Sequence, residues 1–170
     1  PFRTKEFMPI YAFAKDNVIL VVQQDSFNTF DDFVKTAQNR PIRMGGTGQG
    51  TPTVMAGLIL EKALKVKFNF IPYQSGNECV TALAGNHIDA VVTYSSSAAA
   101  LIRAKRIKPL LFFSEERTAA YPQIPTLREL GYDTPGVYSI YGFFAPPNTP
   151  QDRLKVFEAA CDRAARTPAF

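Results

Sequence analysis

Short apolar runs alternate with amphipathic helical patterns along most of this 170-residue chain. The runs at residues 17–23 (NVILVVQ), 68–73 (FNFIPY) and 108–113 (KPLLFF) have the length of buried strands. Stretches with apolar residues at helical spacing separate them, which is the pattern of βα units. The sequence therefore predicts an α/β fold with a mainly parallel sheet flanked by helices.

Caps and periodicity set the bounds of the expected elements. Thr29 is an N-cap before a stretch with acidic residues in its first turn, and Gly85 and Gly131 are expected to end two later helices. We expect strands at 17–23, 42–44, 68–73, 87–94, 108–113 and 137–146, and helices at 29–39, 52–65, 77–85, 95–106, 124–131 and 152–166.

Composition excludes several classes of protein. With 46% hydrophobic and 20% charged residues the chain is globular, and no apolar run is long enough for a transmembrane helix. The net charge is +4, but the basic residues are scattered among acids, which disfavours a nucleic-acid partner. A single histidine and two cysteines cannot assemble a metal site from soft ligands; Cys79 and Cys161 could pair or stay free.

The segment MGGTGQGTP, residues 44–52, joins an expected strand to an expected helix. The dinucleotide pattern GxGxxG, started at Gly46, meets Thr51 where the third glycine belongs, and the P-loop pattern has Thr51 in place of its lysine. What remains is a flexible turn at a helix N-terminus, where free N–H groups suit a carboxylate or phosphate. The missing lysine favours an anion held by neutral donors, and the alternative is a turn whose glycines serve geometry alone.

Two further strands end in small polar residues that open helices, in the segments YQSGNE (73–78) and TYSSS (93–97). The carboxyl ends of parallel strands form the binding edge of an α/β sheet, so the three loops are expected to converge on one ligand. Serine and glycine are also ordinary caps, so any one loop could be structural. Asp89 interrupts an apolar strand and either pairs near the strand end or touches the ligand loops.

No catalytic constellation is visible in the sequence. The pattern GxSxG is absent, and nothing in the segment of His87 resembles a catalytic acid or nucleophile partner. We therefore expect a protein that is not an enzyme and needs no cofactor.

Segments spread over the whole chain resemble, in order, the motifs of one protein family. KEFMPI is similar to KDFTPV, MGGTGQGTP to YGSSGNGS, IPYQSG to VPYKGS, YPQIPTLRELGY to LPDVPTVAEAGL, and YGFFAPPNTP to FGLLAPAGTP. The family is that of the tripartite tricarboxylate transporter receptors, also called Bug or TctC-like periplasmic solute-binding proteins. Together the segments cover nearly the whole chain.

The resemblance implies a two-lobed Venus-flytrap protein with the type II periplasmic binding protein fold. Such a protein closes over a small organic carboxylate, here a di- or tricarboxylate, and delivers it to membrane subunits of a tripartite transporter. The departures of this chain from the family pattern at Thr93 and Tyr94 leave an aromatic carboxylate as an alternative. It implies a periplasmic monomer with a signal peptide upstream and no insertion into the membrane. Residues 1–15 would be the crossover from lobe one, 16–138 the second lobe, and 139–170 the return strand and helix of an incomplete lobe one.

The resemblance also implies that the glycine loop donates backbone N–H groups to the ligand. With Asp89 kept as a candidate, the expected ligand-binding residues are Thr47, Gly48, Gln49, Gly50, Thr51, Tyr73, Ser75, Gly76, Asp89, Thr93, Tyr94 and Ser95. Thr93 and Tyr94 stand where Asp and Asn are frequent, and Gln74 stands where Lys is frequent. The alternative function is a ligand-sensing effector domain of a transcription regulator, which an upstream helix-turn-helix would favour.

Overall fold

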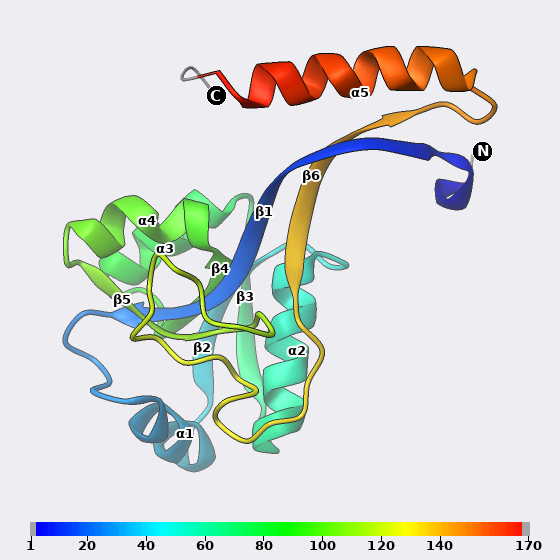
Figure 1. The fold of residues 1–170 in the computed structure, drawn as a ribbon. Helices are drawn as coiled ribbons and strands as arrows, with labels where there is room; N and C mark the ends of the chain where they lie inside the picture. Colours follow the sequence, from blue (N-terminus) through cyan, green and yellow to red (C-terminus); the bar gives the residue numbers. More distant parts are fainter. Residues whose placement is uncertain (1–2, 168–170) are drawn as a thin grey trace. The chain divides into compact units, whose positions relative to one another are not determined.

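The computed structural model describes residues 3–167 and divides into two compact units (Figure 1). Unit 1 contains the described parts of Pro1–Lys15 and Ile140–Phe170, and unit 2 is Asp16–Ser139.

Unit 2 is built on a mixed sheet with the strand order β3-β2-β4-β1-β5. Its strands are β1 (Met8–Gln23) from Asp16 onward, β2 (Ile42–Thr47), β3 (Phe68–Tyr73), β4 (Ala90–Tyr94) and β5 (Ile107–Phe112). β2 runs parallel to β3 and β4, whereas β1 is antiparallel to both β4 and β5. Four strands therefore point the same way and β1 opposes them. The predicted α/β sheet is confirmed, with one reversed strand that periodicity alone does not reveal.

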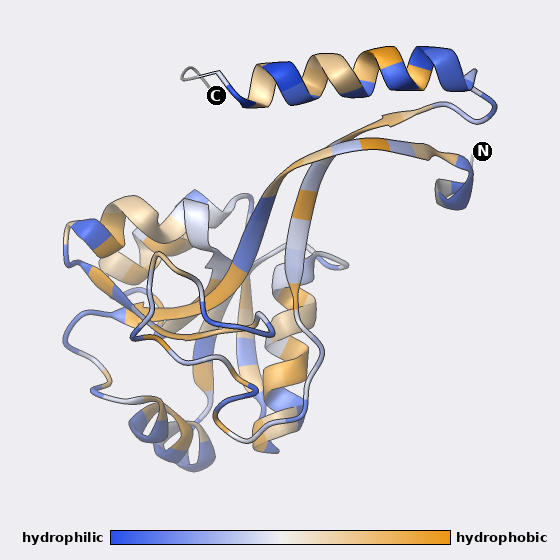
Figure 2. Ribbon diagram, viewed as in Figure 1, coloured by the Kyte–Doolittle hydropathy of each residue, from blue (hydrophilic) through white to orange (hydrophobic). Residues whose placement is uncertain are grey.

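Helices cover both faces of this sheet. Alternate side chains of β1 point to opposite faces, so β1 contributes to two separate apolar clusters. Val18, Leu20 and Val22 belong to the cluster that includes α1 (Phe30–Asn39) and α2 (Pro52–Leu64). Ile19 and Val21 belong to the cluster that includes α3 (Gly76–Ala84) and α4 (Ser95–Arg103). In Figure 2 this part of β1 is coloured as strongly hydrophobic.

The start of α1 confirms its predicted cap. Thr29 Oγ1 accepts a hydrogen bond from Asp32 N, and the Asp32 carboxylate accepts one from Thr29 N, both at 3.1 Å. This reciprocal pair satisfies two backbone donors that would otherwise lack partners at the helix N-terminus.

The helix expected at residues 124–131 is not formed. Phe112 N donates to Pro125 O and Leu127 N donates to Phe112 O, each at 2.9 Å, so this part of the chain pairs with the end of β5. The residues that follow form a single turn, which ends at Gly131, where φ is +91°. The prediction was wrong because Pro125 and Leu127 form backbone hydrogen bonds with Phe112 of β5 in place of helical hydrogen bonds.

Unit 1 contains η1 (Thr4–Glu6), β6 (Tyr138–Ala145) from Ile140 onward and α5 (Gln151–Ala165). β6 pairs with β1, and Gly142 allows this close approach, because a Cβ there would lie 2.6 Å from the Tyr11 carbonyl oxygen. Among the described residues, no helix has the length and apolar character needed to cross a membrane.

Both cysteines are free thiols. Cys79 is buried on α3, and burial raises the pKa of its thiol to about 11. Cys161 lies on α5 and is partly exposed. The sequence left open whether Cys79 and Cys161 form a disulfide, and in the structure they do not.

Candidate functional site

The carboxyl ends of three parallel strands lie at one edge of the unit 2 sheet. Thr47, the last residue of β2, is the register partner of Tyr73, the last residue of β3. β4 runs parallel to β2 and ends at Tyr94, and α2, α3 and α4 begin after these strands (Figure 1). The structure thus brings the three predicted loops to the same edge.

The loop between β2 and α2 is held in shape by its own hydroxyl groups. Thr53 is buried, and its Oγ1 lies 3.0 Å from Thr47 Oγ1 and 3.0 Å from Thr51 Oγ1. Thr51 also lies 3.0 Å from the Gly48 carbonyl oxygen and accepts from Val54 N as the N-cap of α2. The side chains of Thr47 and Thr51, predicted to bind ligand, therefore bond within the loop.

Backbone donors at the tip of this loop remain available. Within residues 3–167 no hydrogen bond is found from the N–H groups of Gln49 and Gly50, and both residues are exposed. Gly50 has φ +83°, a conformation that favours glycine. The N–H groups lie at the start of α2, where the helix dipole is positive, so the loop tip suits a carboxylate.

The second loop is occupied by its own helix cap. Ser75 Oγ accepts from Glu78 N at 3.2 Å, and the Glu78 carboxylate accepts from Gln74 N at 3.0 Å. A carboxylate of the protein therefore already lies at the N-terminus of α3. Gly76 lets α3 approach β4, because a Cβ there would lie 2.8 Å from Thr93 Oγ1.

The third loop bonds to an acid of β1 that sequence reasoning missed. Asp16, which is buried, accepts hydrogen bonds from Ser95 Oγ at 2.9 Å and from the backbone N and the hydroxyl of Ser96. Asp16 therefore caps α4, whose N-cap residue Tyr94 makes no side-chain cap bond. The signal that could have revealed it is a lone acid just before the apolar run at 17–23.

Two other side chains of the third loop are also buried or bonded. The Tyr94 hydroxyl oxygen accepts from Ser139 Oγ at 2.9 Å. The Thr93 hydroxyl is buried and has no hydrogen-bond partner among the described residues. A buried hydroxyl without a partner costs free energy, about 1–3 kcal/mol.

Asp89 lies at the opposite end of β4 from these loops, directly before its first residue. Its carboxylate accepts from Arg40 at 2.9 Å, from Arg43 Nη2 at 3.0 Å and from the Arg43 backbone N at 2.8 Å. Burial acts to raise the pKa of Asp89, but the bonds from Arg43 and Arg40 outweigh it and hold that pKa well below its usual range. The ion pair is therefore the alternative that the structure supports, and Asp89 does not join the ligand loops.

A pocket of about 510 Å³ opens beside the glycine loop. Thr47, Gly48, Gln49 and Gly50, which were expected to bind ligand, line one side of it, whereas the second and third loops do not contribute to its lining. It is lined by Gly46, Thr47, Gly48, Gln49 and Gly50, and by the apolar residues Val54, Leu58, Phe70, Ile71 and Pro72.

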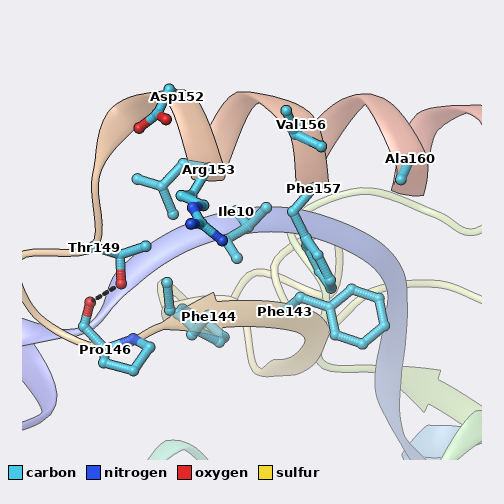
Figure 3. Close-up of a pocket in the computed structure, with 12 residues that line it drawn as sticks. Ile10, Phe143, Phe144, Pro146, Thr149, Asp152, Arg153, Val156, Phe157 and Ala160 are labelled. Carbon is cyan, nitrogen blue, oxygen red and sulfur yellow. Dashed lines mark hydrogen bonds between the residues drawn. The ribbon is translucent and has the colours of Figure 1, made fainter.

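A larger hollow of about 730 Å³ lies in unit 1 beside α5 (Figure 3). Its lining is mainly apolar: Phe157 of α5 points toward Phe143 of β6, with ring centroids 5.7 Å apart. No described residue of α5 is buried. The hollow has the character of a packing surface, since convergent polar groups, which fix a small ligand, are few there.

The family model for the tripartite tricarboxylate transporter family receptor matches residues 1–170. The chain belongs to this receptor family. The resemblance found in the sequence is therefore confirmed.

Two curated relatives are distant in sequence but align over at least 96% of the chain. A UPF0065 protein of Bordetella pertussis is 29% identical over 173 residues, which cover 100% of this chain and 54% of the relative. A UPF0065 protein of a Pseudomonas species is 28% identical over 96% of this chain and 50% of its own length. The chain thus spans about half the length of these curated relatives.

Solved structures show the same fold. A TctC solute-binding protein from Polaromonas superposes with a TM-score of 0.83 at 26% identity, over 98% of this chain and 58% of its own. MatC from Rhodopseudomonas palustris, solved with bound malate, gives a TM-score of 0.80 at 23% identity, over 95% and 56%. The fold of this chain is therefore shared with these solved proteins.

Proposed function

We propose that this chain is part of a periplasmic receptor that captures a small organic carboxylate and passes it, chemically unchanged, to the membrane subunits of a tripartite transporter. The observation that carries the proposal is the glycine loop, whose Gln49 and Gly50 N–H groups are free at the start of α2. Membership of the receptor family over the whole chain favours this function over a regulator's effector domain.

The three helix N-termini at the sheet edge differ in the charge they already carry. Glu78 places a carboxylate at the start of α3, and Asp16 places one at the start of α4. α2 has no acidic residue in its first turn. A ligand carboxylate is therefore least repelled at α2, where the dipole and the free N–H groups both favour it.

Neutral donors suit a receptor that must release what it binds. The pocket beside the loop has no charged residue in its lining. Hydrogen bonds between an ionised carboxylate and backbone N–H groups are strong enough to orient a ligand. They lack the additional strength of the bidentate ion pair that an arginine would form. In this proposal Thr47 and Thr51 shape the loop, and the backbone of residues 48–50 contacts the ligand.

The two compact units support a proposed domain organisation. Unit 2 would be the second lobe, and the described segments of unit 1 would belong to lobe one. The remainder of lobe one, which relatives of twice this length would contain, would supply the facing wall of the cleft. MatC, which shares the fold, was solved with malate, a carboxylate of the proposed class.

The proposal is tested by calorimetry on the complete gene product with a panel of mono-, di- and tricarboxylates. We expect saturable binding of at least one carboxylate. Gln49→Glu should weaken that binding about tenfold, because it adds a negative charge beside the free N–H groups. Gln49→Met, of similar size and neutral, should change it by less than about threefold.

Two results would contradict the proposal. If the folded protein binds no carboxylate of the panel, the ligand class is wrong. If a bound compound is converted to another during the measurement, which mass spectrometry of the recovered ligand detects, the protein is not simply a receptor.

A further inference from the structure

Within residues 3–167 the chain passes between the two compact units at two places. One lies in β1, between Lys15 and Asp16, and the other lies in β6, between Ser139 and Ile140. Asp16 and Ser139 are therefore the residues at which these two strands leave unit 2. The contacts that hold these two residues determine where each strand can begin to bend.

Both residues bond to the β4–α4 junction, which consists of Tyr94, Ser95 and Ser96. The Asp16 carboxylate accepts from Ser95 Oγ at 2.9 Å and from Ser96 N at 3.3 Å. Ser139 Oγ donates to the Tyr94 hydroxyl oxygen at 2.9 Å. Two strand positions that are far apart in the sequence are thus held by consecutive residues of one loop.

The chain is fixed on the unit 2 side of this junction and exposed on the other side. Val18 O accepts from Phe113 N at 2.9 Å, and Val137 N donates to Phe113 O at 2.8 Å. Both valines are buried, whereas residues 12–15 and Ile140 are exposed. Segments with little burial absorb bending more readily than a packed core does.

We infer that the β4–α4 junction is a single anchor for both crossing strands, so that movement of one unit relative to the other bends them at residues 12–15 and 140–141. Gly142 packs against the Tyr11 carbonyl oxygen within unit 1, which limits the bending part on that side. The inference rests on the proposed function, because closure over a ligand is the movement that bends the strands. Asp16 and the Tyr94 hydroxyl are then positioning groups that act on the strands.

Tyr94→Phe tests the anchor with little disturbance, because it removes the hydroxyl that accepts from Ser139 and keeps the ring. Hydrogen exchange of the complete gene product, free of ligand, is followed by mass spectrometry. We expect exchange at residues 138–141 to become about threefold faster in this variant, since a hydrogen bond that opposes local opening is lost.

Asp16→Ala tests the other strand and the sharing of the anchor. Bonds to an ionised carboxylate are stronger than bonds between neutral groups, so exchange at residues 12–16 should become about tenfold faster. Because one junction holds both strands, residues 138–141 should also exchange at least about twofold faster. Tyr94→Phe remains informative if Asp16→Ala folds poorly.

Tyr132→Phe and Asp32→Ala are the matched controls. Tyr132 is a partly buried tyrosine packed on the cluster of α1 and α2, and Asp32 caps α1. Among the described residues no recorded hydrogen bond joins either of them to Asp16 or Ser139. Each control should change exchange at the two crossings by less than about twofold.

Unchanged exchange at residues 138–141 in Tyr94→Phe would overturn the inference. So would an equal acceleration in β2 and β3, because it would report a general loss of stability. No ligand is used in this experiment, so its failure is distinct from failure of the carboxylate panel, which would remove the proposed function and leave the anchor as a property of unit 2.

Discussion

Asp89 shows what a single residue contributes to unit 2. Its side chain is 10% exposed and accepts bonds from Arg40 and Arg43, which are themselves half exposed. We expect Asp89→Asn to lower the free energy of unfolding at pH 7 by about 1–3 kcal/mol, since charged hydrogen bonds are lost. Urea unfolding measures this. Asp25→Asn, at an exposed position without a recorded ion pair among the described residues, should cost less than about 0.5 kcal/mol.

The same pair makes stability depend on pH in a defined direction. The pKa of Asp89 is lowered in the folded state, so its stabilisation is complete above the unfolded-state pKa of about 4. It is lost as the pH falls toward the depressed folded-state pKa. The difference between the wild type and Asp89→Asn should therefore shrink below pH 4, and an undiminished difference at pH 2 would contradict this assignment.

Side-chain roles were the least predictable part of the site. The loop at Gln49 and Gly50 could be predicted from the sequence, because glycines between an expected strand and an expected helix indicate a turn. It could not show that Thr47 and Thr51 bond to the buried Thr53, since that depends on how the turn folds. Asp16 was missed because it is 79 residues away from Ser95, the hydroxyl that it accepts from.

Among the contacts between secondary-structure elements, a hydrogen bond to Glu61 connects the start of β3 to α2. The Glu61 carboxylate is 7% exposed and accepts from the buried Phe68 N at 2.6 Å, whereas its partner Lys67 is 90% exposed. We expect Glu61→Ala to destabilise unit 2 by about 1–3 kcal/mol, because it leaves a buried N–H group without an acceptor.

Glu61→Gln is the informative control for that prediction. The amide oxygen can still accept from Phe68 N, and the exposed ion pair with Lys67 is worth little. Thermal or urea unfolding should place this variant within about 1 kcal/mol of the wild type. If both variants lose the same stability, the charge matters and the hydrogen bond to Phe68 does not.

Most elements could be predicted from the sequence because local signals and tertiary packing agree. β3 lies at Phe68–Tyr73 as expected, and α1 begins after its predicted cap at Thr29. Two features could not be predicted. The direction of β1 is not encoded in apolar periodicity, and the pairing of Thr126 with Phe112 is a long-range contact that overrides local helix signals.

At the scale of the whole chain, unit 2 has the structural means to fold alone. Both apolar clusters lie wholly within residues 16–139, including Val137, which pairs with Phe113. We expect the isolated segment 16–139 to show α/β circular dichroism and cooperative thermal unfolding, with the 170-residue chain as the reference. A segment without a cooperative transition, beside a longer chain that has one, would show that unit 1 is needed for folding.

The unequal burial of the two cysteines has a practical consequence for spectroscopy. With its pKa near 11, Cys79 holds almost no thiolate at neutral pH, and its burial excludes bulky reagents. Cys161, partly exposed on α5, is the more accessible of the two thiols. Within this 170-residue chain, Cys161 is therefore the preferred attachment point for a fluorophore or spin label on α5, without an engineered cysteine.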